Sequence, residues 1–342
     1  MTQVEQPLLR RALYRKLAIA AALAVAVSLP HVLGSYWLGI AILIAVLGLF
    51  ALSHDLMMGH TGLVSLGQVA FFGMAAYTVA LLQVRYDHPA WFAIVAGLAA
   101  AVLLAAILGI AVRTKGIYFI LLTMALGLIF WGTAHRWTRL TRGESGISGI
   151  RLPEVAGLQL GRLEYYYYIV LVVTILCVAA YARIVSSPFG LTLRGIRESE
   201  NRMQALGYRV ALHKYVAFVL SGALSGVAGV LFVYYNNFIS PTSIELVRAA
   251  EAVLAVIIGG TGTIVGPFIG AAIITVVRQE LSADIARWMT LLGVIFILTA
   301  LYASDGIVGQ LRRARSWRRP ASSDGGGPAV GLRDDGAGAD VQ

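Results

Sequence analysis

Side chains that could do chemistry are sparse in this sequence. Six histidines are scattered through 342 residues, and the single cysteine, Cys177, lies in an apolar run, so a disulfide within the chain and a CxxC metal site are both excluded. The GxxxxGK[ST] phosphate loop, the GxSxG nucleophile elbow and the HExxH zinc motif are absent. The sequence therefore predicts a protein that is not an enzyme by itself and that holds no metal or other cofactor.

Two acidic residues could serve a path through a membrane. Glu251 begins a glycine-rich apolar region, and Asp55 directly follows another apolar run. A charge inside a helix bundle is often functional, because burying a charge in the membrane costs free energy. Both residues lie near the predicted ends of apolar segments, where water is available. Glu251 is therefore a candidate path residue, and an interfacial role remains the alternative for both.

Two glycine-rich segments carry small polar side chains at similar spacing. GHTGLVSLGQVAFFGMAAY at 59–77 and GGTGTIVGPFIGAA at 259–272 both read G-x-T-G and then place further glycines before small residues. They could be a repeat whose broken helices meet at a substrate path, where helix ends offer N–H and C=O groups. Chance similarity and helix packing are the alternative. The candidate path residues are Thr61, Ser65 and Gln68 in the first segment and Gly260, Thr261 and Gly262 in the second.

The composition predicts which elements must position these residues. The chain is 58% hydrophobic and only 13% charged, and several apolar runs reach the length that crosses a bilayer. The runs do not alternate polar and apolar residues as a β-barrel does. We expect an all-α polytopic membrane protein of 8–10 transmembrane helices. Apolar spans are predicted at 17–34, 36–53, 63–83, 90–112, 117–134, 165–182, 214–235 and 286–303, with a broken or re-entrant segment near 249–277.

The placement of charge predicts the topology. The net charge is +10, and arginines and lysines gather before the first apolar span and after the last one. Such clusters stay cytoplasmic, which predicts both termini inside and an even number of crossings. The segment 249–277 is then a re-entrant hairpin or two crossings. The loop 135–164 falls outside, although it carries five arginines. The membrane explains these clusters, so no nucleic-acid partner is predicted.

The predicted domain organisation has three parts. A cytoplasmic basic segment at 1–16 precedes a membrane domain at 17–303, and a basic tail at 304–342 follows it. The tail is rich in Gly, Pro, Ser and Asp, which predicts disorder.

One long polar stretch interrupts the membrane domain at 183–213. Within it, Ser186-Ser187-Pro188 is a helix-start pattern, and from Leu193 to Leu206 only Gly195 is a helix breaker. Gly207 is expected to end the helix in the left-handed conformation. A short amphipathic cytoplasmic helix at 193–207 with a glycine stop is typical of a docking element. A helix that lies on lipid headgroups is the alternative.

Several of these segments resemble one family. GHTGLVSLGQVAFFGMAAYTVALL (59–82), the stretch 189–232 and IIGGTGTIVGPFIGAA (257–272) resemble signatures of the permeases of bacterial branched-chain amino acid ABC importers, on the side of the M-type subunit. The segment RGESGISGI (142–150) resembles a family loop but lacks its pair of glycines. The resemblance covers about residues 36–303.

The resemblance implies partners and a location. An H-type permease would form the other half of the path, two cytoplasmic ATPases would bind ATP and dock on 193–207, and an extracytoplasmic binding protein would deliver substrate. The chain would lie in the lipid bilayer of the bacterial inner membrane. The implied docking residues are Arg194, Arg197, Glu198, Asn201, Ala205, Leu206 and Gly207.

The cargo and the energy source leave alternatives. Branched-chain amino acids are the implied substrates, and importers of urea, short amides and aromatic acids share these signatures. An ion-coupled secondary transporter should carry a carboxylate in the middle of a span, and none is found there. A membrane scaffold would leave the two glycine-rich breaks unexplained.

Overall fold

The computed structural model describes residues 24–152, 154–155, 158–159, 162–284, 290 and 293–294. Residues 24–32 are helical. The longer helices that follow are α2 (Ser35–Thr61), α3 (Gln68–Val84), α4 (Ala90–Leu108), α5 (Ile117–Arg136), α7 (Leu163–Ser186), α8 (Pro188–Glu198), α10 (Val210–Asn236), α11 (Leu246–Gly259) and α12 (Gly266–Asp284). The short helices are η1 (Gly109–Arg113), α6 (Thr138–Thr141), η2 (Gly143–Ser145), α9 (Glu200–Ala205) and η3 (Pro241–Ile244).

Five helical segments of the described chain are long and apolar enough to cross a membrane. They are α2, α4 with η1, α5, α7 and α10, and α3 is a shorter apolar helix. The prediction of an all-α polytopic membrane protein is confirmed. The predicted span 63–83 begins too early, because α3 starts only at Gln68, after Gly67. The segment 1–16 and the tail 304–342 lie outside the described residues, as do most of 286–303 and part of 17–34.

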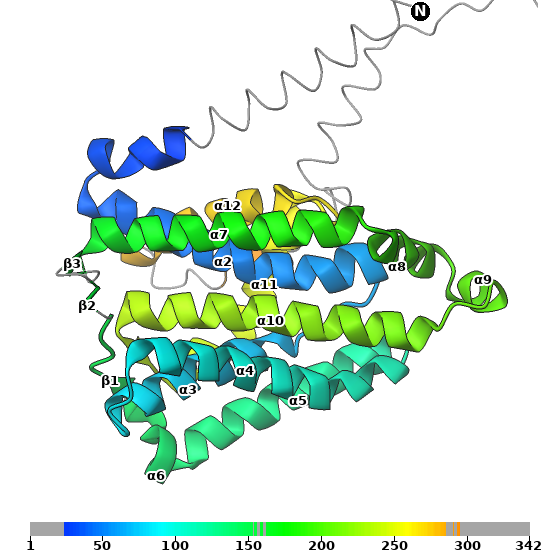
Figure 1. Cartoon of the computed structure of the whole chain (residues 1–342), viewed down its shortest axis with the longest axis horizontal. Helices are drawn as coiled ribbons and strands as arrows, with labels where there is room; N and C mark the ends of the chain where they lie inside the picture. The colour runs from blue at the N-terminus through cyan, green and yellow to red at the C-terminus, as the bar shows by residue number, and fades with distance from the viewer. Residues whose placement is uncertain are drawn as a thin grey trace, which may run out of the picture.

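The long helices lie side by side around α2 and α10 (Figure 1). These two helices are mostly buried, whereas α4, α5 and α7 turn most of their side chains outward. Glycines let α10 approach its neighbours closely, since a Cβ at Gly226 would lie 2.7 Å from the Ala101 side chain on α4. Small residues at such contacts are typical of helices that pack in a membrane.

The two ends of the helix bundle differ in structure. One end carries α8 and α9, and we call it the α8–α9 end (Figure 1). The opposite end, called the β-strand end, carries α6 and four short strands, β1 (Ile147–Ser148), β2 (Glu154–Val155), β3 (Leu158–Gln159) and β4 (Phe238–Ile239). β1 pairs antiparallel with β4, and β2 with β3. The pairing of β1 with β4 joins the loop before α7 to the turn after α10.

The glycine-rich region 249–277 is an antiparallel hairpin, and the predicted break in it is confirmed. α11 ends at Gly259 and α12 begins at Gly266, so residues 260–265 are not helical. Near the β-strand end, Glu251 of α11 pairs with Arg278 of α12.

The hairpin also follows α2 along its length. Tyr36 near the start of α2 contacts Glu280, Gly48 contacts Phe268, and Gly59 contacts Gly262. α12 and the break therefore extend along nearly the whole length of α2. A hairpin of this length favours two crossings over a short re-entrant loop.

Candidate functional site

The polar stretch between α7 and α10 folds as two short helices. Ser187 caps α8, its hydroxyl accepting the N–H of Gly190 at 3.4 Å. At Ser199 the backbone is extended, and the Ser199 hydroxyl accepts the N–H of Arg202 at 3.3 Å as the cap of α9. The predicted single helix at 193–207 is therefore wrong. The sequence contained the signal, because Ser199 followed by Glu200 is a helix start with an acidic first turn.

Gly207 ends α9 as predicted. Its φ is +85°, in the left-handed region that glycine adopts without strain. The N–H of Gly207 donates to the carbonyl of Gln204 at 2.9 Å, and the N–H of Tyr208 donates to the carbonyl of Met203 at 3.1 Å. These two bonds define a Schellman cap, which fixes the direction in which the chain leaves α9 toward α10.

The predicted docking residues fall into two groups. The side chains of Leu193 and Ile196 are buried and hold α8 on the body of the protein. Two predicted docking arginines also reach back to the body, Arg194 to the carbonyl of Val185 at 2.9 Å and Arg197 to the carbonyl of Gly59. The remaining predicted docking residues, Glu198, Asn201, Ala205, Leu206 and Gly207, are exposed.

An ion-pair cluster that the sequence analysis missed anchors α9. The carboxylate of Glu200 accepts a hydrogen bond from Lys214 of α10 at 2.8 Å and lies 3.4 Å from the ammonium of Lys115. Partial burial opposes ionisation of Glu200, but the hydrogen bond and the charge of Lys214, together with Lys115, outweigh it and lower the pKa of this carboxyl. Lys214 is 4% exposed. A single lysine in a mostly apolar segment was the sequence signal for an acidic partner, because a buried lysine is almost always paired.

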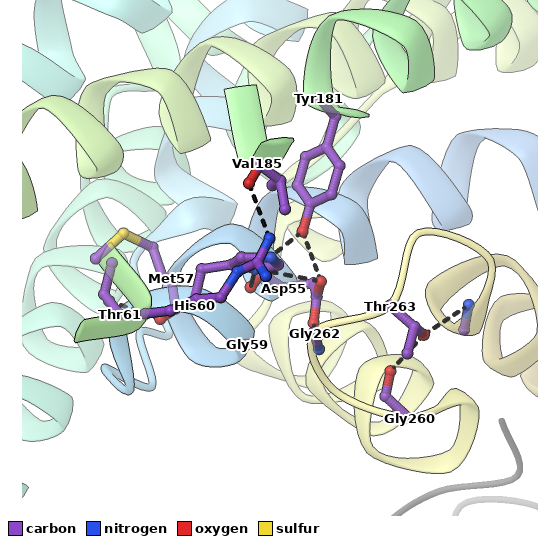
Figure 2. Close-up of polar contacts among 12 residues, drawn as sticks. Asp55, Met57, Gly59, His60, Thr61, Tyr181, Val185, Gly260, Gly262 and Thr263 are labelled. Atoms are coloured by element: carbon purple, nitrogen blue, oxygen red, sulfur yellow. Dashed lines mark hydrogen bonds and ion pairs between the residues drawn. The ribbon is translucent and has the colours of Figure 1, made fainter. Parts of the chain in front are cut away.

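A buried polar cluster lies where α2, α7 and the break between α11 and α12 meet (Figure 2). Asp55 of α2 is fully buried, and one oxygen of its carboxylate accepts a hydrogen bond from the Tyr181 hydroxyl of α7 at 2.6 Å. The other oxygen accepts the backbone N–H of Gly262 at 2.6 Å. His60 lies 3.9 Å from the carboxylate and 3.3 Å from the Tyr181 hydroxyl. Asp55 thus joins three segments that are far apart in the sequence and is shielded from water by them.

The second glycine-rich break, 260–265, is held at this cluster. Gly260 and Gly262 have φ values of +109° and +73°, and a Cβ at Gly59 would lie 2.5 Å from the nitrogen of Gly262. Thr263 closes the turn, donating to the carbonyl of Gly260 at 2.8 Å and accepting from the N–H of Gly266 at 3.1 Å. Thr261 is half-buried beside Gly262. The predicted residues Gly260 and Gly262 therefore shape the break through their backbone.

The first break, 62–67, is tied into the packing of the bundle. Thr61 donates to the carbonyl of Met57, and Ser65 accepts the N–H of Gly67. The Gln68 amide donates to the Ser221 hydroxyl of α10 at 3.1 Å. All three predicted path residues here, Thr61, Ser65 and Gln68, are buried. Their contacts fit the packing interpretation, and a role in a path stays a prediction.

Arg197 lies between the two breaks. Its side-chain carbons border Gly62, and its guanidinium borders Gly262 while it binds the carbonyl of Gly59. One residue of α8 therefore touches the end of α2 and both non-helical segments. The predicted path residue Glu251 lies elsewhere, toward the β-strand end, where it is 3% exposed and 3.2 Å from Arg278.

Comparison with known proteins identifies the family. Residues 36–300 match the family model described as "Branched-chain amino acid transport system / permease component". The chain is 30% identical to the high-affinity branched-chain amino acid transport system permease protein LivM of Escherichia coli (strain K12), over 87% of this chain and 76% of that protein.

More distant relatives match shorter parts of the chain. It is 30% identical over 40% of its length to a probable branched-chain amino acid transport permease protein LivH of Methanocaldococcus jannaschii, covering 46% of that protein. It is 28% identical over 35% of its length to the autoinducer 2 import system permease protein LsrC of Photorhabdus laumondii, covering 38% of that protein. No solved structure shows significant similarity to it. The match over most of the chain, together with its apolar helices, shows that the chain is a multi-pass membrane protein of the branched-chain amino acid transport permease family.

Proposed function

We propose that this chain is one of two permease subunits of an ATP-driven importer of branched-chain amino acids in a bacterial cytoplasmic membrane. The other subunit would be an H-type permease, an extracytoplasmic binding protein would deliver the substrate, and two ATPases would dock on the α8–α9 end. That end and both termini would then face the cytoplasm. The names of the LivM and LivH relatives support the substrate and the pair of permeases.

The shape of the α8–α9 end is the observation that carries the docking proposal. Leu206, Tyr208 and Leu212 are 67%, 46% and 51% exposed around the Schellman cap at Gly207. Apolar side chains gathered on a polar segment mark an interaction site. The backbone beneath them is held by Glu200 and Arg197, so a partner that moves this segment would also move what Arg197 binds.

A movement of α8 would reach the buried cluster around Asp55 through Arg197. Arg197 binds the carbonyl of Gly59 and borders Gly262, and Gly262 belongs to the break between α11 and α12. In the proposed cycle, displacement of α8 by the ATPases shifts the break at 260–265 and so changes access to the path along α11. A ligand-driven change requires contacts that differ between two states, and the Arg197 contact is the one that we assign to this role.

The docking proposal is tested by Leu206→Asp in the complete importer. A charge in the apolar centre of an interface should abolish co-purification of the ATPases and reduce ATP-dependent uptake of radiolabelled leucine by more than about tenfold. Tyr86→Asp is the matched control, because Tyr86 is 56% exposed and precedes α4 at the opposite end.

Three results would decide between the alternatives. Normal uptake by the Leu206→Asp importer would refute docking on this surface and return α9 to an interfacial helix on lipid. Uptake by the chain in liposomes without ATPases, driven by an ion gradient, would establish a secondary transporter. Uptake of urea, short amides or aromatic acids in preference to leucine would replace the proposed substrate.

A further inference from the structure

A charged cavity opens at the β-strand end of α11. Its volume is about 600 Å³, within the range of small-molecule sites, which is about 300–1,000 Å³. Its wall includes Leu43 of α2, Phe232 of α10, the start of α11 and Arg278 of α12. The cavity thus lies among α2, α10, α11 and α12, at the opposite end of α11 from the break at 260–265.

One face of α11 supplies charges of both signs to this cavity. Glu245, the residue before α11, and Arg248 and Glu251 of α11 follow each other at intervals of three residues, and all three line the cavity. This interval places Arg248 and Glu251 on neighbouring positions of the helix surface. Glu251 pairs with Arg278 at 3.2 Å through one of its two oxygens. The wall therefore contains two carboxylates and two guanidinium groups close together.

Arg248 is held by an aromatic ring. Its guanidinium carbon lies 4.5 Å from the centroid of the Phe232 ring. Within the described part of the chain, neither Arg248 nor Glu245 forms an ion pair. A guanidinium positioned by a cation–π contact keeps its donors for another acceptor, and a carboxylate is the acceptor that matches its two parallel N–H groups.

The apolar part of the wall lies beside the charges. Leu43, Phe232 and Val247 contribute apolar side chains to the same cavity. A ligand that satisfies all of these groups has a carboxylate for Arg248, an ammonium for Glu251 or Glu245, and an aliphatic side chain. Urea has no charge to offer them, and a carboxylic acid without an amine brings no cation for Glu245.

We propose that this cavity binds a free zwitterionic aliphatic amino acid, with its carboxylate on Arg248 and its ammonium on Glu251 and Glu245. The site rests on the proposed function, because it would receive the substrate released by the binding protein. It adds that the permease itself selects for the two charges of the amino acid. α11 would then connect the occupied cavity directly to the break that Asp55 and Arg197 hold.

The experiment measures binding to the whole importer in nanodiscs without the binding protein. Ligand-observed saturation-transfer NMR titrations compare L-leucine, 4-methylpentanoate, which lacks the ammonium, and 3-methylbutylamine, which lacks the carboxylate. We expect the two analogues to bind about tenfold or more weakly than leucine, since each loses one charge-assisted hydrogen-bonding group. Arg248→Gln should weaken leucine and 4-methylpentanoate but leave 3-methylbutylamine unchanged.

A matched control separates the site from general effects. Arg85→Gln makes the same substitution in a different cavity at the same end of the molecule, which Arg85 lines with Arg139 and Arg142. This variant should bind all three probes as the wild type does. Glu245→Gln is the complementary variant, because Glu245 is outside the Glu251–Arg278 pair, and it should weaken leucine and 3-methylbutylamine while 4-methylpentanoate is unchanged.

Two outcomes would overturn the site. One is that the wild-type importer does not prefer leucine over its analogues. The other is that Arg248→Gln weakens all three probes equally, which would give Arg248 a structural role only. ATP-dependent leucine uptake is measured on the same preparation. If the binding results overturn the site while ATP-dependent leucine uptake persists, only this inference is refuted. If the wild-type importer shows no ATP-dependent leucine uptake, the proposed function itself is refuted.

Discussion

The two glycine-rich breaks look alike in sequence but are held in different ways. The break at 62–67 is bound to α5 by the bond from Leu66 to Thr123, and Gln68, the residue that follows the break, donates to Ser221 of α10. The break at 260–265 is held to another helix by the bond from Gly262 to Asp55, and Val265 within it is 60% exposed. Segments with few packing contacts open most readily, so the second break is the better candidate for movement during transport.

The largest expected effect concerns Gly59, where α2 meets the second break. A Cβ at this position would collide with the Asp55 carboxylate and with the backbone nitrogen of Gly262, neither of which is free to move away. Gly59→Ala should therefore destabilise the protein by about 1–3 kcal/mol and abolish uptake. The melting temperature of the purified importer and leucine uptake measure these two effects.

Gly67→Ala is the matched substitution at the first break. There the new Cβ would lie 3.2 Å from the carbonyl of Thr123, a tight contact that small shifts relieve, and φ of Gly67 is −80°, which alanine adopts without strain. We expect a loss of less than about 1 kcal/mol. Equal damage from Gly59→Ala and Gly67→Ala would contradict the difference between the two breaks.

The second prediction concerns the charge that holds Gly262. Asp55→Asn keeps the shape of the side chain but has one acceptor oxygen where the carboxylate uses two, so it sets an NH2 group beside either the N–H of Gly262 or the hydroxyl of Tyr181. The bond that remains is neutral and weaker by about 1 kcal/mol than the charge-assisted one. Uptake should fall by about tenfold, because the break is no longer held in one position. Ser221→Ala removes the partner of Gln68 at the first break and should change uptake by less than about twofold. A larger effect of Ser221→Ala would make the first break the moving one.

The sequence predicted the helices well and the contacts between them poorly. Long apolar runs and the Gly-Pro cluster at 259–267 predicted the spans and the break in the second glycine-rich region, because both signals are local. The partners of Asp55 come from residues 181 and 262, more than a hundred positions away, and no periodicity links them. The break at Ser199 was local but was overridden in the prediction by the run of helix-forming residues around it.

The third prediction tests the link from α8 to the second break. Arg194 and Arg197 are both arginines of α8, but Arg194 binds the carbonyl of Val185 at the end of α7, whereas Arg197 reaches Gly59 and Gly262. Arg197→Gln should reduce leucine uptake per ATP hydrolysed by about fivefold, which corresponds to the roughly 1 kcal/mol that a typical hydrogen bond contributes. Arg194→Gln should leave this ratio unchanged. A parallel fall of uptake and ATPase activity in Arg197→Gln would indicate loss of assembly and not of coupling.

The smallest expected effect is at the anchor of α9 and depends on pH. Lys214 and Lys115 lower the pKa of Glu200 below its ordinary value near 4.5. The lowered pKa means that the ionised carboxylate stabilises the folded protein at pH values above 4.5. This contribution is lost as the pH falls through the lower folded pKa, where protonation removes the charge.

Glu200→Gln measures that contribution directly. Because the carboxylate is 24% exposed and one of its two lysines is largely exposed, we expect a loss of only about 1 kcal/mol at neutral pH. The difference in unfolding free energy between wild type and variant should shrink below pH 4.5 and vanish once Glu200 is protonated in the folded state. Lys115→Gln, which removes the exposed partner and keeps Lys214, should cost less than Glu200→Gln. A difference that stays constant with pH would show that Glu200 contributes through its shape and not through its charge.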